Sequence, residues 1–204
     1  ESGGWTSAKA LFSQEVEPQY THNYGHIACA TDGTLYAACH FYNIGGSDNQ
    51  PVTGDRSKMR SYGAAVLKST DLGATCCDLH GDPVDLPTTY NHRIAIPPFD
   101  RNIYINTIAL DTLNTLWALT LNPGLEDNAV WLSRWVGQDW QTIQLERYMP
   151  ESRTPVESMM TIDTHNRLHI VLTTVDTAAV GTDSHWGHPS SEVLYLRSND
   201  GGQT

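Results

Sequence analysis

Charged residues and long hydrophobic runs are scarce in this sequence of 204 residues. Only 12 Lys and Arg residues stand against 23 Asp and Glu residues, and the net charge is −11. A phosphate backbone would be repelled unless a local basic cluster existed, and the sequence shows none, so a nucleic-acid partner is not expected. No apolar run reaches the roughly eighteen residues that a bilayer requires, so no insertion into a membrane is expected.

Cysteine is sparse as well, and it fixes no disulfide framework. The four residues Cys29, Cys39, Cys76 and Cys77 allow two disulfides or none, and their spacing determines no connectivity. A domain of this size does not need such links, so the cysteines leave the cellular compartment open. The sequence opens at Glu1 without a signal-peptide pattern, and we expect it to be processed or to belong to something longer.

Residues that could bind a metal form two groups without paired spacing. Neither group contains the Cys-x-x-Cys pairs typical of zinc sites, so no metal ligand is assigned, and a structural zinc or calcium remains an open alternative. The first group is Cys39, His40, Cys76, Cys77, Asp78 and His80, and the second is His165, His169, His185 and His188.

Convincing helical periodicity is also absent, whereas a hairpin pattern recurs three times. Residues 26–40, 105–119 and 159–172 each read as an apolar strand, a turn and a second apolar strand. The turns contain Asp32 with Gly33, Asp111 with Asn114, and Asp163 with Asn166. Each turn therefore combines an aspartate with a residue that tolerates positive φ, which indicates tight hairpins in an all-β protein.

A second repeated element follows the strands predicted at 64–67 and 193–196. Residues 69–75 and 198–204 share the pattern Ser-x-Asp-x-Gly-x-Thr, and residues 133–140 are a degenerate copy. The short Ser and Asp side chains can bond to the backbone and the Gly can adopt positive φ, so these residues are expected to stabilise turns and not to act in catalysis.

Together the repeats predict a β-propeller of four-stranded antiparallel blades. We expect a single partial propeller over residues 1–204, with about three blades near 20–90, 103–146 and 156–204. Propellers usually close with four to eight blades, because an open arc leaves sheet faces uncovered. The chain is therefore expected to be part of a larger propeller, completed by missing blades or by other copies of the chain.

The repeated turns carry a family resemblance. The pattern Ser-x-Asp-x-Gly-x-Thr-Trp resembles the Asp-box, or BNR repeat, of sialidase-type β-propellers, with Cys76 in the Trp place. The run 69–87, the segment 162–169 and the pair Trp135 and Trp140 are similar to the BNR-repeat family that includes ulvan-lyase-type polysaccharide lyases. The resemblance implies a secreted or extracellular, carbohydrate-binding propeller from a lyase that cleaves a uronic-acid-containing glycan by β-elimination.

The segments His22-Asn-Tyr24 and His40-Phe-Tyr42 resemble the blade that carries the lyase histidines of that family, although Gly25 replaces its Pro. Such a lyase must neutralise the uronate carboxylate, remove the C5 proton and protonate the leaving oxygen. Histidine near neutral pKa suits the base and a tyrosine hydroxyl suits the acid. The resemblance thus implies His22 and His40 as bases and Tyr24 or Tyr42 as the acid. The alternative is a structural role, in which both histidines form hydrogen bonds to the backbone at a blade edge.

Substrate contacts are expected from two loops. Arg56 or Arg60, in the Gly- and Ser-rich stretch before the strand at 64–68, could hold a carboxylate through a forked pair of hydrogen bonds. Trp186, between two histidines in a polar loop, could stack on a sugar ring or simply cover the blade beneath it. The predicted partner is therefore a polysaccharide.

Two other functions remain open. A non-catalytic propeller module for adhesion or assembly, on a virion or a cell surface, would use tryptophans partly as core and partly as binding surface. A sialidase-like glycoside hydrolase would need an arginine triad. The run Arg93-Ile-Ala-Ile-Pro97 is only distantly similar to the Arg-Ile-Pro motif, and no partner arginines are placed.

Overall fold

A computed structural model describes residues 6–14, 24–42, 61–99, 102–122, 129–179 and 188–202. Within these ranges the chain is all-β, with no α-helix and only two short 3-10 helices, η2 (Glu146–Tyr148) and η3 (Thr177–Ala179). The strands are β1 (Gly25–Cys29), β2 (Leu35–Tyr42), β3 (Ser61–Ser69), β4 (Ala95–Ile96), β5 (Tyr104–Leu110), β6 (Leu116–Leu121), β7 (Val130–Val136), β8 (Asp139–Gln144), β9 (Arg153–Ile162), β10 (Leu168–Asp176) and β11 (Glu192–Ser198). No helix in these ranges is both long and apolar enough to cross a bilayer.

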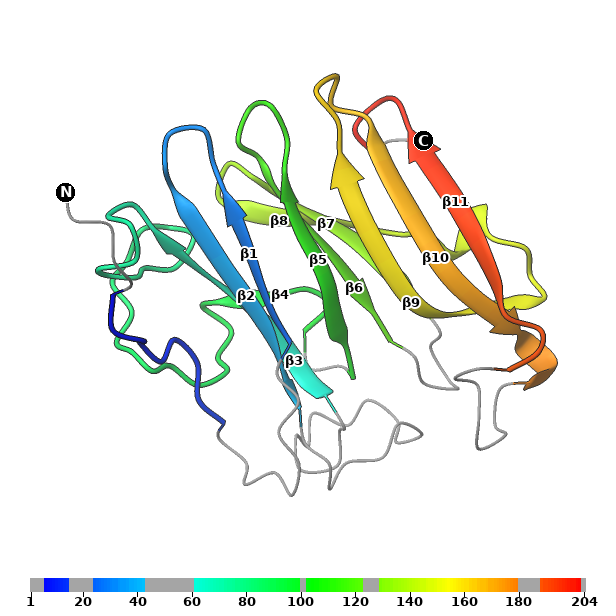
Figure 1. Ribbon diagram of the computed structural model, residues 1–204, viewed down its shortest axis with the longest axis horizontal. Helices are drawn as coiled ribbons and strands as arrows, with labels where there is room; N and C mark the ends of the chain where they lie inside the picture. Colours follow the sequence, from blue (N-terminus) through cyan, green and yellow to red (C-terminus); the bar gives the residue numbers. More distant parts are fainter. Residues whose placement is uncertain are drawn as a thin grey trace.

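The strands form three antiparallel sheets that stand side by side (Figure 1). Sheet 1 has the order β1-β2-β3-β4, sheet 2 the order β5-β6-β7-β8, and sheet 3 the order β11-β10-β9. The expected four strands are thus present in two sheets, while the described part of sheet 3 has three. The first strand of each sheet lies beside the first strand of the next, β1 beside β5 and β5 beside β9. This arrangement is consistent with a partial β-propeller-like fold, and the described sheets do not close a ring.

Sheet 2 is buried on both faces. Because successive side chains of a strand point to opposite faces, Ala118 packs toward sheet 1 and Leu119 toward sheet 3. The core between sheets 1 and 2 includes Ala38, Val66, Ile96, Ile103, Ile108 and Trp131. The core between sheets 2 and 3 includes Trp117, Leu132, Met160, Leu168, Ile170 and Leu172.

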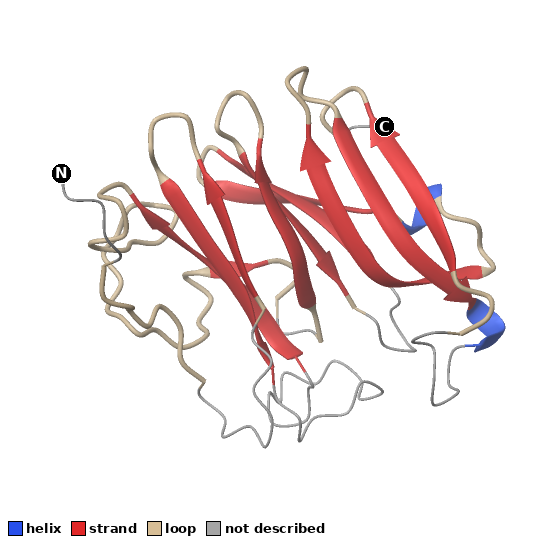
Figure 2. Cartoon of the chain, in the orientation of Figure 1, coloured by secondary structure: helices blue, strands red, loops and turns tan. Residues whose placement is uncertain are grey.

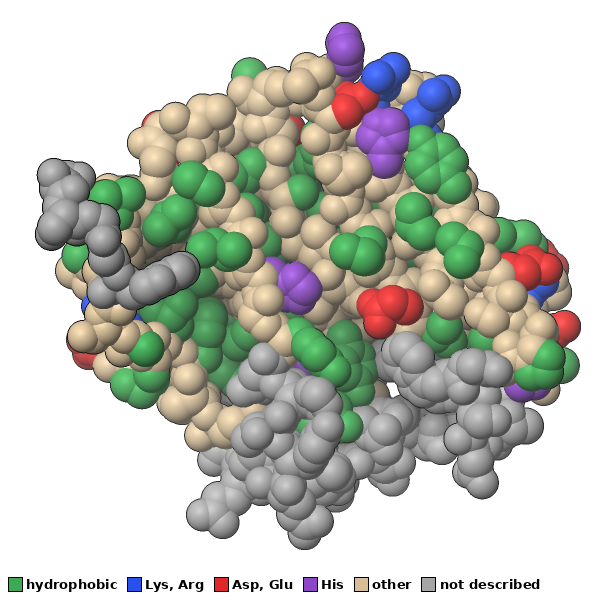
Figure 3. Space-filling view, viewed as in Figure 1, with side chains coloured by type: hydrophobic (Ala, Val, Ile, Leu, Met, Phe, Trp, Pro, Cys, Tyr) green, Lys and Arg blue, Asp and Glu red, His purple; other side chains and the backbone are tan. Residues whose placement is uncertain are grey.

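The outer faces of sheets 1 and 3 differ. On sheet 1, Phe41 and Tyr62 are covered by Tyr90 and by Phe12 from the first described segment. The outer face of sheet 3 carries polar side chains such as His169 and, in addition, exposed apolar ones, and hydrophobic atoms are visible over its strands in Figure 3. These apolar side chains are Met159, Val171, Val193 and Tyr195.

The three predicted hairpins are confirmed, with one shift in alignment. They join β1 to β2, β5 to β6, and β9 to β10, and their tips lie at one end of the sheets (Figure 2). The positive-φ residues are Gly33 at 87°, Asn114 at 62° and Asn166 at 59°. Asp111 and Asp163 open their turns, whereas Ala30 opens the first turn and Asp32 lies two residues later. The three positive-φ residues therefore occupy equivalent positions in their turns, whereas Asp32 does not occupy the position of Asp111 and Asp163.

The hairpin tips are joined from sheet to sheet by asparagine. Asn114 Oδ1 accepts hydrogen bonds from the backbone N–H of Thr31 at 3.1 Å and from its hydroxyl at 3.2 Å, and Asn114 Nδ2 lies 3.0 Å from the same hydroxyl. One sheet further on, Asn166 Oδ1 accepts from the backbone N–H of Thr112 at 2.8 Å. We call these two contacts the asparagine clasps.

The two Asp-turn repeats share the hydrogen bonds of their serine within residues 69–73 and 198–202. Gly73 N–H donates to Ser69 Oγ at 2.9 Å, and Gly202 N–H donates to Ser198 Oγ at 2.7 Å. In each turn the serine hydroxyl also bonds to the aspartate two residues later. The predicted degenerate copy at 133–140 is wrong, because β7 and β8 are joined there by an ordinary two-residue turn at 137–138.

Candidate functional site

An aromatic cluster lies at the end of the sheets opposite the hairpin tips. Tyr24 directly precedes β1, His40 and Tyr42 end β2, and Tyr104 opens β5 of the next sheet. The His40 ring lies 5.4 Å from the Tyr24 ring and 4.9 Å from the Tyr104 ring, while Tyr42 lies 6.2 Å from Tyr104. Three residues predicted from the sequence thus come together, joined by Tyr104, which the sequence analysis missed.

The members of this cluster differ in access to solvent. His40 shares with Ala38 the face of β2 that packs on sheet 2, and it is 1% exposed. Tyr24 is 52% exposed. Within this cluster Tyr24 is therefore the exposed member, whereas His40 is buried.

Two further polar contacts involve residues of strand β9. A bulge in β5 at Asn106 directs its amide to the Glu157 carboxylate of β9, where Nδ2 donates to Oε1. Arg153, at the start of β9, donates to the carbonyl of Ser190 at 2.6 Å and pairs with Glu192. No sequence signal distinguishes these residues, because a bulge and a contact between sheets depend on the folded register.

His26 of β1 joins the first two sheets near the cluster. Its Nε2 lies 3.1 Å from the carbonyl oxygen of Ile105. Burial lowers the pKa of His26, and the opposing effect of the Ile105 carbonyl does not restore it. A neutral imidazole is therefore favoured, and His26 is best described as a link between β1 and β5.

Four predicted site residues, His22, Arg56, Arg60 and Trp186, lie outside the described residues. The roles that the sequence suggested for them remain predictions.

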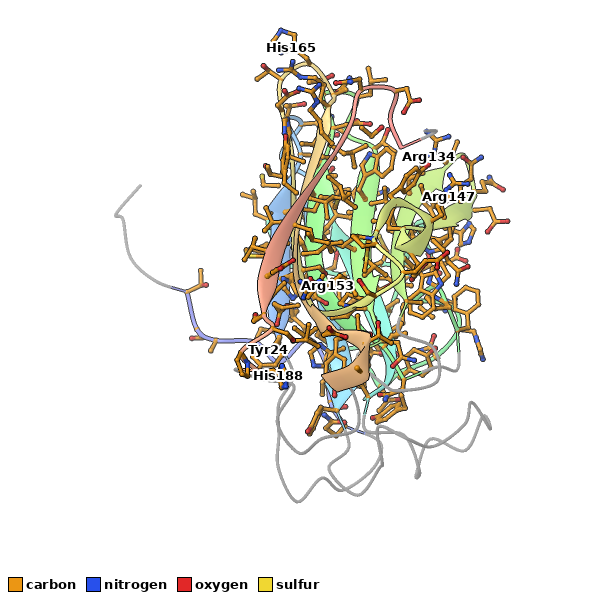
Figure 4. All side chains as sticks on the ribbon, turned by 90° about the vertical axis from the view of Figure 1, so that its right-hand side faces the viewer. Tyr24, Arg134, Arg147, Arg153, His165 and His188 are labelled. Carbon is orange, nitrogen blue, oxygen red and sulfur yellow. The ribbon has the colours of Figure 1, made fainter. Side chains whose placement is uncertain are left out.

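The described members of the two candidate metal-binding groups do not converge, and His185 lies outside the described residues. No group of three or more His, Cys, Asp or Glu side chains that could hold a metal ion occurs in the described part of the chain. His165 lies at a hairpin tip and His188 near the opposite end, on the side of Tyr24 (Figure 4). His169 instead bonds to Tyr195 at 2.6 Å and to Asp163 at 3.2 Å.

All four cysteines are free thiols. Burial raises the pKa of the Cys39 thiol strongly, and burial also raises the pKa values of Cys76 and Cys77. These cysteines are accordingly poor nucleophiles.

Arg93, the residue that suggested a sialidase motif, is tied to a nearby loop. Its Nε donates to Asp78 Oδ2 at 2.7 Å, and its Nη2 donates to the carbonyls of Asp82 at 3.0 Å and Pro83 at 2.6 Å. The Asp78 side chain is fully buried. Burial raises its pKa, but the backbone N–H of Asp82, Arg93 and the N–H of Gly81 outweigh burial, so the net shift is downward and Asp78 remains charged.

Comparisons place these sheets among known folds. No protein-family model matches the sequence, and no curated protein matches it significantly. A protein of unknown function from Dyadobacter fermentans is similar in structure, with a TM-score of 0.54 and 15% identity over 88% of this chain and 48% of the other. An ulvan lyase from a new polysaccharide lyase family, bound to a -[GlcA(1-4)Rha3S]- saccharide, gives a TM-score of 0.58 and 12% identity over 96% of this chain and 44% of the other.

These similarities define the fold and leave the activity to be established. The chain spans less than half the length of either structure. Three antiparallel sheets arranged around their first strands, together with these neighbours, are consistent with a partial β-propeller-like fold.

Proposed function

We propose that this chain is a polysaccharide-binding sector of a BNR-type β-propeller, with its sugar site at Tyr24, His40, Tyr42 and Tyr104. The observation that carries the proposal is the convergence of these rings from two sheets at the end opposite the hairpin tips. The fold likeness to an ulvan lyase solved with a glucuronate-containing saccharide supports this choice of ligand. The matching turns at 69–73 and 198–202 support the assignment to the BNR type. Such a protein would be secreted, because its polymer lies outside the cell.

The finer proposal is β-elimination on a uronate residue. In this reaction a base removes the C5 proton, the C4–O bond breaks as the C4=C5 double bond forms, and the leaving oxygen takes a proton. Tyr24 is the exposed group of the cluster, and we assign its hydroxyl to protonation of the leaving oxygen. The C5 proton passes in this proposal to His22, the base that the sequence predicts and that lies outside the described residues. His40 positions the Tyr24 and Tyr104 rings from beneath, so we assign it a positioning role and not direct contact.

The test combines binding and elimination measurements. The protein is incubated with a polyuronate, and the ultraviolet absorbance of the unsaturated uronate product is followed, while calorimetry measures binding. Tyr24→Phe keeps the ring but removes the hydroxyl, so elimination should stop while binding persists. Tyr195→Phe, on the outer face of sheet 3, is the matched control and should change neither. Normal elimination by Tyr24→Phe would disprove the role of Tyr24.

A second candidate, a non-catalytic module for adhesion or assembly, is favoured by the outer face of sheet 3. Met159 is 66% exposed and Val193 is 68% exposed there. In addition, the backbone N–H of Thr164 occupies the hairpin position from which Thr31 and Thr112 donate to the asparagine clasps, and it has no acceptor among the described residues. Both features fit another sheet of the same kind, from missing blades or from a second copy. Binding without elimination, and loss of association after Met159→Ser in sedimentation experiments, would favour this candidate.

A further inference from the structure

A groove lies away from the aromatic cluster, between the segment after β3 in sheet 1 and the β7–β8 hairpin of sheet 2. Its distinctive lining residues are His80, His92, Arg93, Phe99, Trp135 and Trp140. None of them belongs to the site around Tyr24. The groove therefore combines aromatic rings with one cation, Arg93, and one carboxylate, Asp139, whose Oδ1 accepts the backbone N–H of Trp140 at 2.7 Å.

The aromatic part of the groove is built by strand pairing. Trp135 and Trp140 are directly opposite each other on β7 and β8, with ring centroids 5.5 Å apart at 74°. His80 meets Trp135 from sheet 1 at 5.1 Å and 80°. Both tryptophans pack partly against the core and remain half-buried. Neither indole N–H donates to a described residue, so both are available to a ligand.

The cation of the groove is fixed in place before any ligand arrives. Arg93 uses Nε and Nη2 for Asp78 and two backbone carbonyls, while its Nη1 has no hydrogen-bond partner among the described residues. The Arg93 side chain is 49% exposed, whereas Asp78 behind it is fully buried. A guanidinium held in this way loses little conformational entropy on binding, and its remaining donors suit a carboxylate or a sulfate.

We propose that this groove is a second carbohydrate site, which binds an acidic sugar residue. The carboxylate or sulfate ester of the sugar bonds to Arg93, and its ring lies against the tryptophans, which supply an apolar surface and indole N–H donors. The proposal does not depend on the Tyr24 site or on β-elimination. The two sites lie on different parts of the sheets.

Nitrogen-15 NMR of the indole N–H groups tests the proposal. The probes are a galacturonate tetrasaccharide, a neutral glucose tetrasaccharide and inorganic sulfate. The acidic tetrasaccharide should shift the indole signals of Trp135 and Trp140 and leave that of Trp117, in the core between sheets 2 and 3, unchanged. Equal shifts with the neutral sugar would overturn the role of Arg93, and equal shifts with sulfate alone would overturn the sugar assignment. Absence of any shift would overturn the site.

Variants separate binding from folding. Arg93→Lys keeps a charge for Asp78 but loses the fork, so affinity for the acidic tetrasaccharide should fall about tenfold or more with little change in melting temperature. Arg134→Gln, the neighbour of Trp135 on β7, removes a cation whose guanidinium lies over the Trp117 ring, and it should leave the affinity unchanged. The indole signals of Trp135 and Trp140 report on this groove, whereas the elimination assay reports on the Tyr24 site, so failure of one site is distinguished from failure of the other. Unchanged affinity in Arg93→Lys would contradict the proposal.

Discussion

Replacement of Asn114 by glycine should weaken the first asparagine clasp without straining the backbone. Glycine adopts the 62° φ of this position freely, so the change removes only the side-chain hydrogen bonds to Thr31. Each such bond contributes roughly 0.5–1.5 kcal/mol, and solvent replaces part of it at an exposed site. We expect the free energy of unfolding to fall by about 1 kcal/mol in Asn114→Gly. Asn114→Ala should lose about 1–2 kcal/mol more, because alanine is disfavoured in the left-handed region.

The matched position is Asn166, which makes one clasp bond instead of several. Asn166→Gly should therefore cost less than Asn114→Gly, on the order of 0.5–1 kcal/mol. Urea denaturation measures both losses, and amide hydrogen exchange locates them. Exchange at Thr31 should accelerate only in Asn114→Gly, and exchange at Thr112 only in Asn166→Gly. If all the variants were as stable as the unchanged protein, or if exchange at Thr31 and Thr112 did not change, the clasps would have no stabilising role.

Three further predictions concern other parts of the sheets. In Gly63→Ala the new Cβ would lie 2.2 Å from the buried Tyr90 ring, so denaturant unfolding should show a loss of about 1–3 kcal/mol or more; a loss below this range would mean that the ring moves freely. Ser69→Ala removes the hydroxyl that accepts the Gly73 N–H and should cost about 1–2 kcal/mol, whereas no change in urea midpoint would deny this turn a structural role. The third prediction is a fall in stability in acid. The backbone N–H and hydroxyl of Thr75, followed by Ser69, lower the pKa of Asp71 to about 2. An unfolded aspartate has a pKa of about 3.9. The contribution of ionised Asp71 to the free energy of unfolding is therefore complete above that pH and is lost as the pH falls through about 2. Urea midpoints measured from about pH 5 down to about pH 2 should decline, and Asp71→Asn should flatten the decline.

The sequence predicted the elements that are determined by residues close together along the chain. The hairpins at Gly33, Asn114 and Asn166 were found because a residue that tolerates positive φ separates two apolar strands. The serine and aspartate turns were found because their hydrogen bonds form within a few residues. The degenerate copy at 133–140 failed since a serine, a glycine and a tryptophan match the letters without the aspartate that organises the turn.

Features that depend on the tertiary register could not be read from the sequence. β4 has only two residues and joins β3 after a long excursion, so no periodicity marks it. Tyr104 belongs to the site because sheet 2 packs against β2, and the pairing of Arg93 with Asp78 spans fifteen residues of loop. A pattern search identifies residue types at short spacing, whereas these contacts are created by the packing of one sheet on the next.

The two ends of the sheets have different physical roles. The hairpin tips hold the asparagine clasps, and the serine of the first repeated turn pairs with the start of β2 at the same end. At the other end, Tyr24 is exposed beside a buried histidine, in a setting that suits contact with a ligand. Tyr24 and Tyr104 come from different sheets, which are held together by the apolar core between sheets 1 and 2 and, at the hairpin tips, by the clasp of Asn114 with Thr31. The packing of one sheet on the next is therefore what brings these rings together.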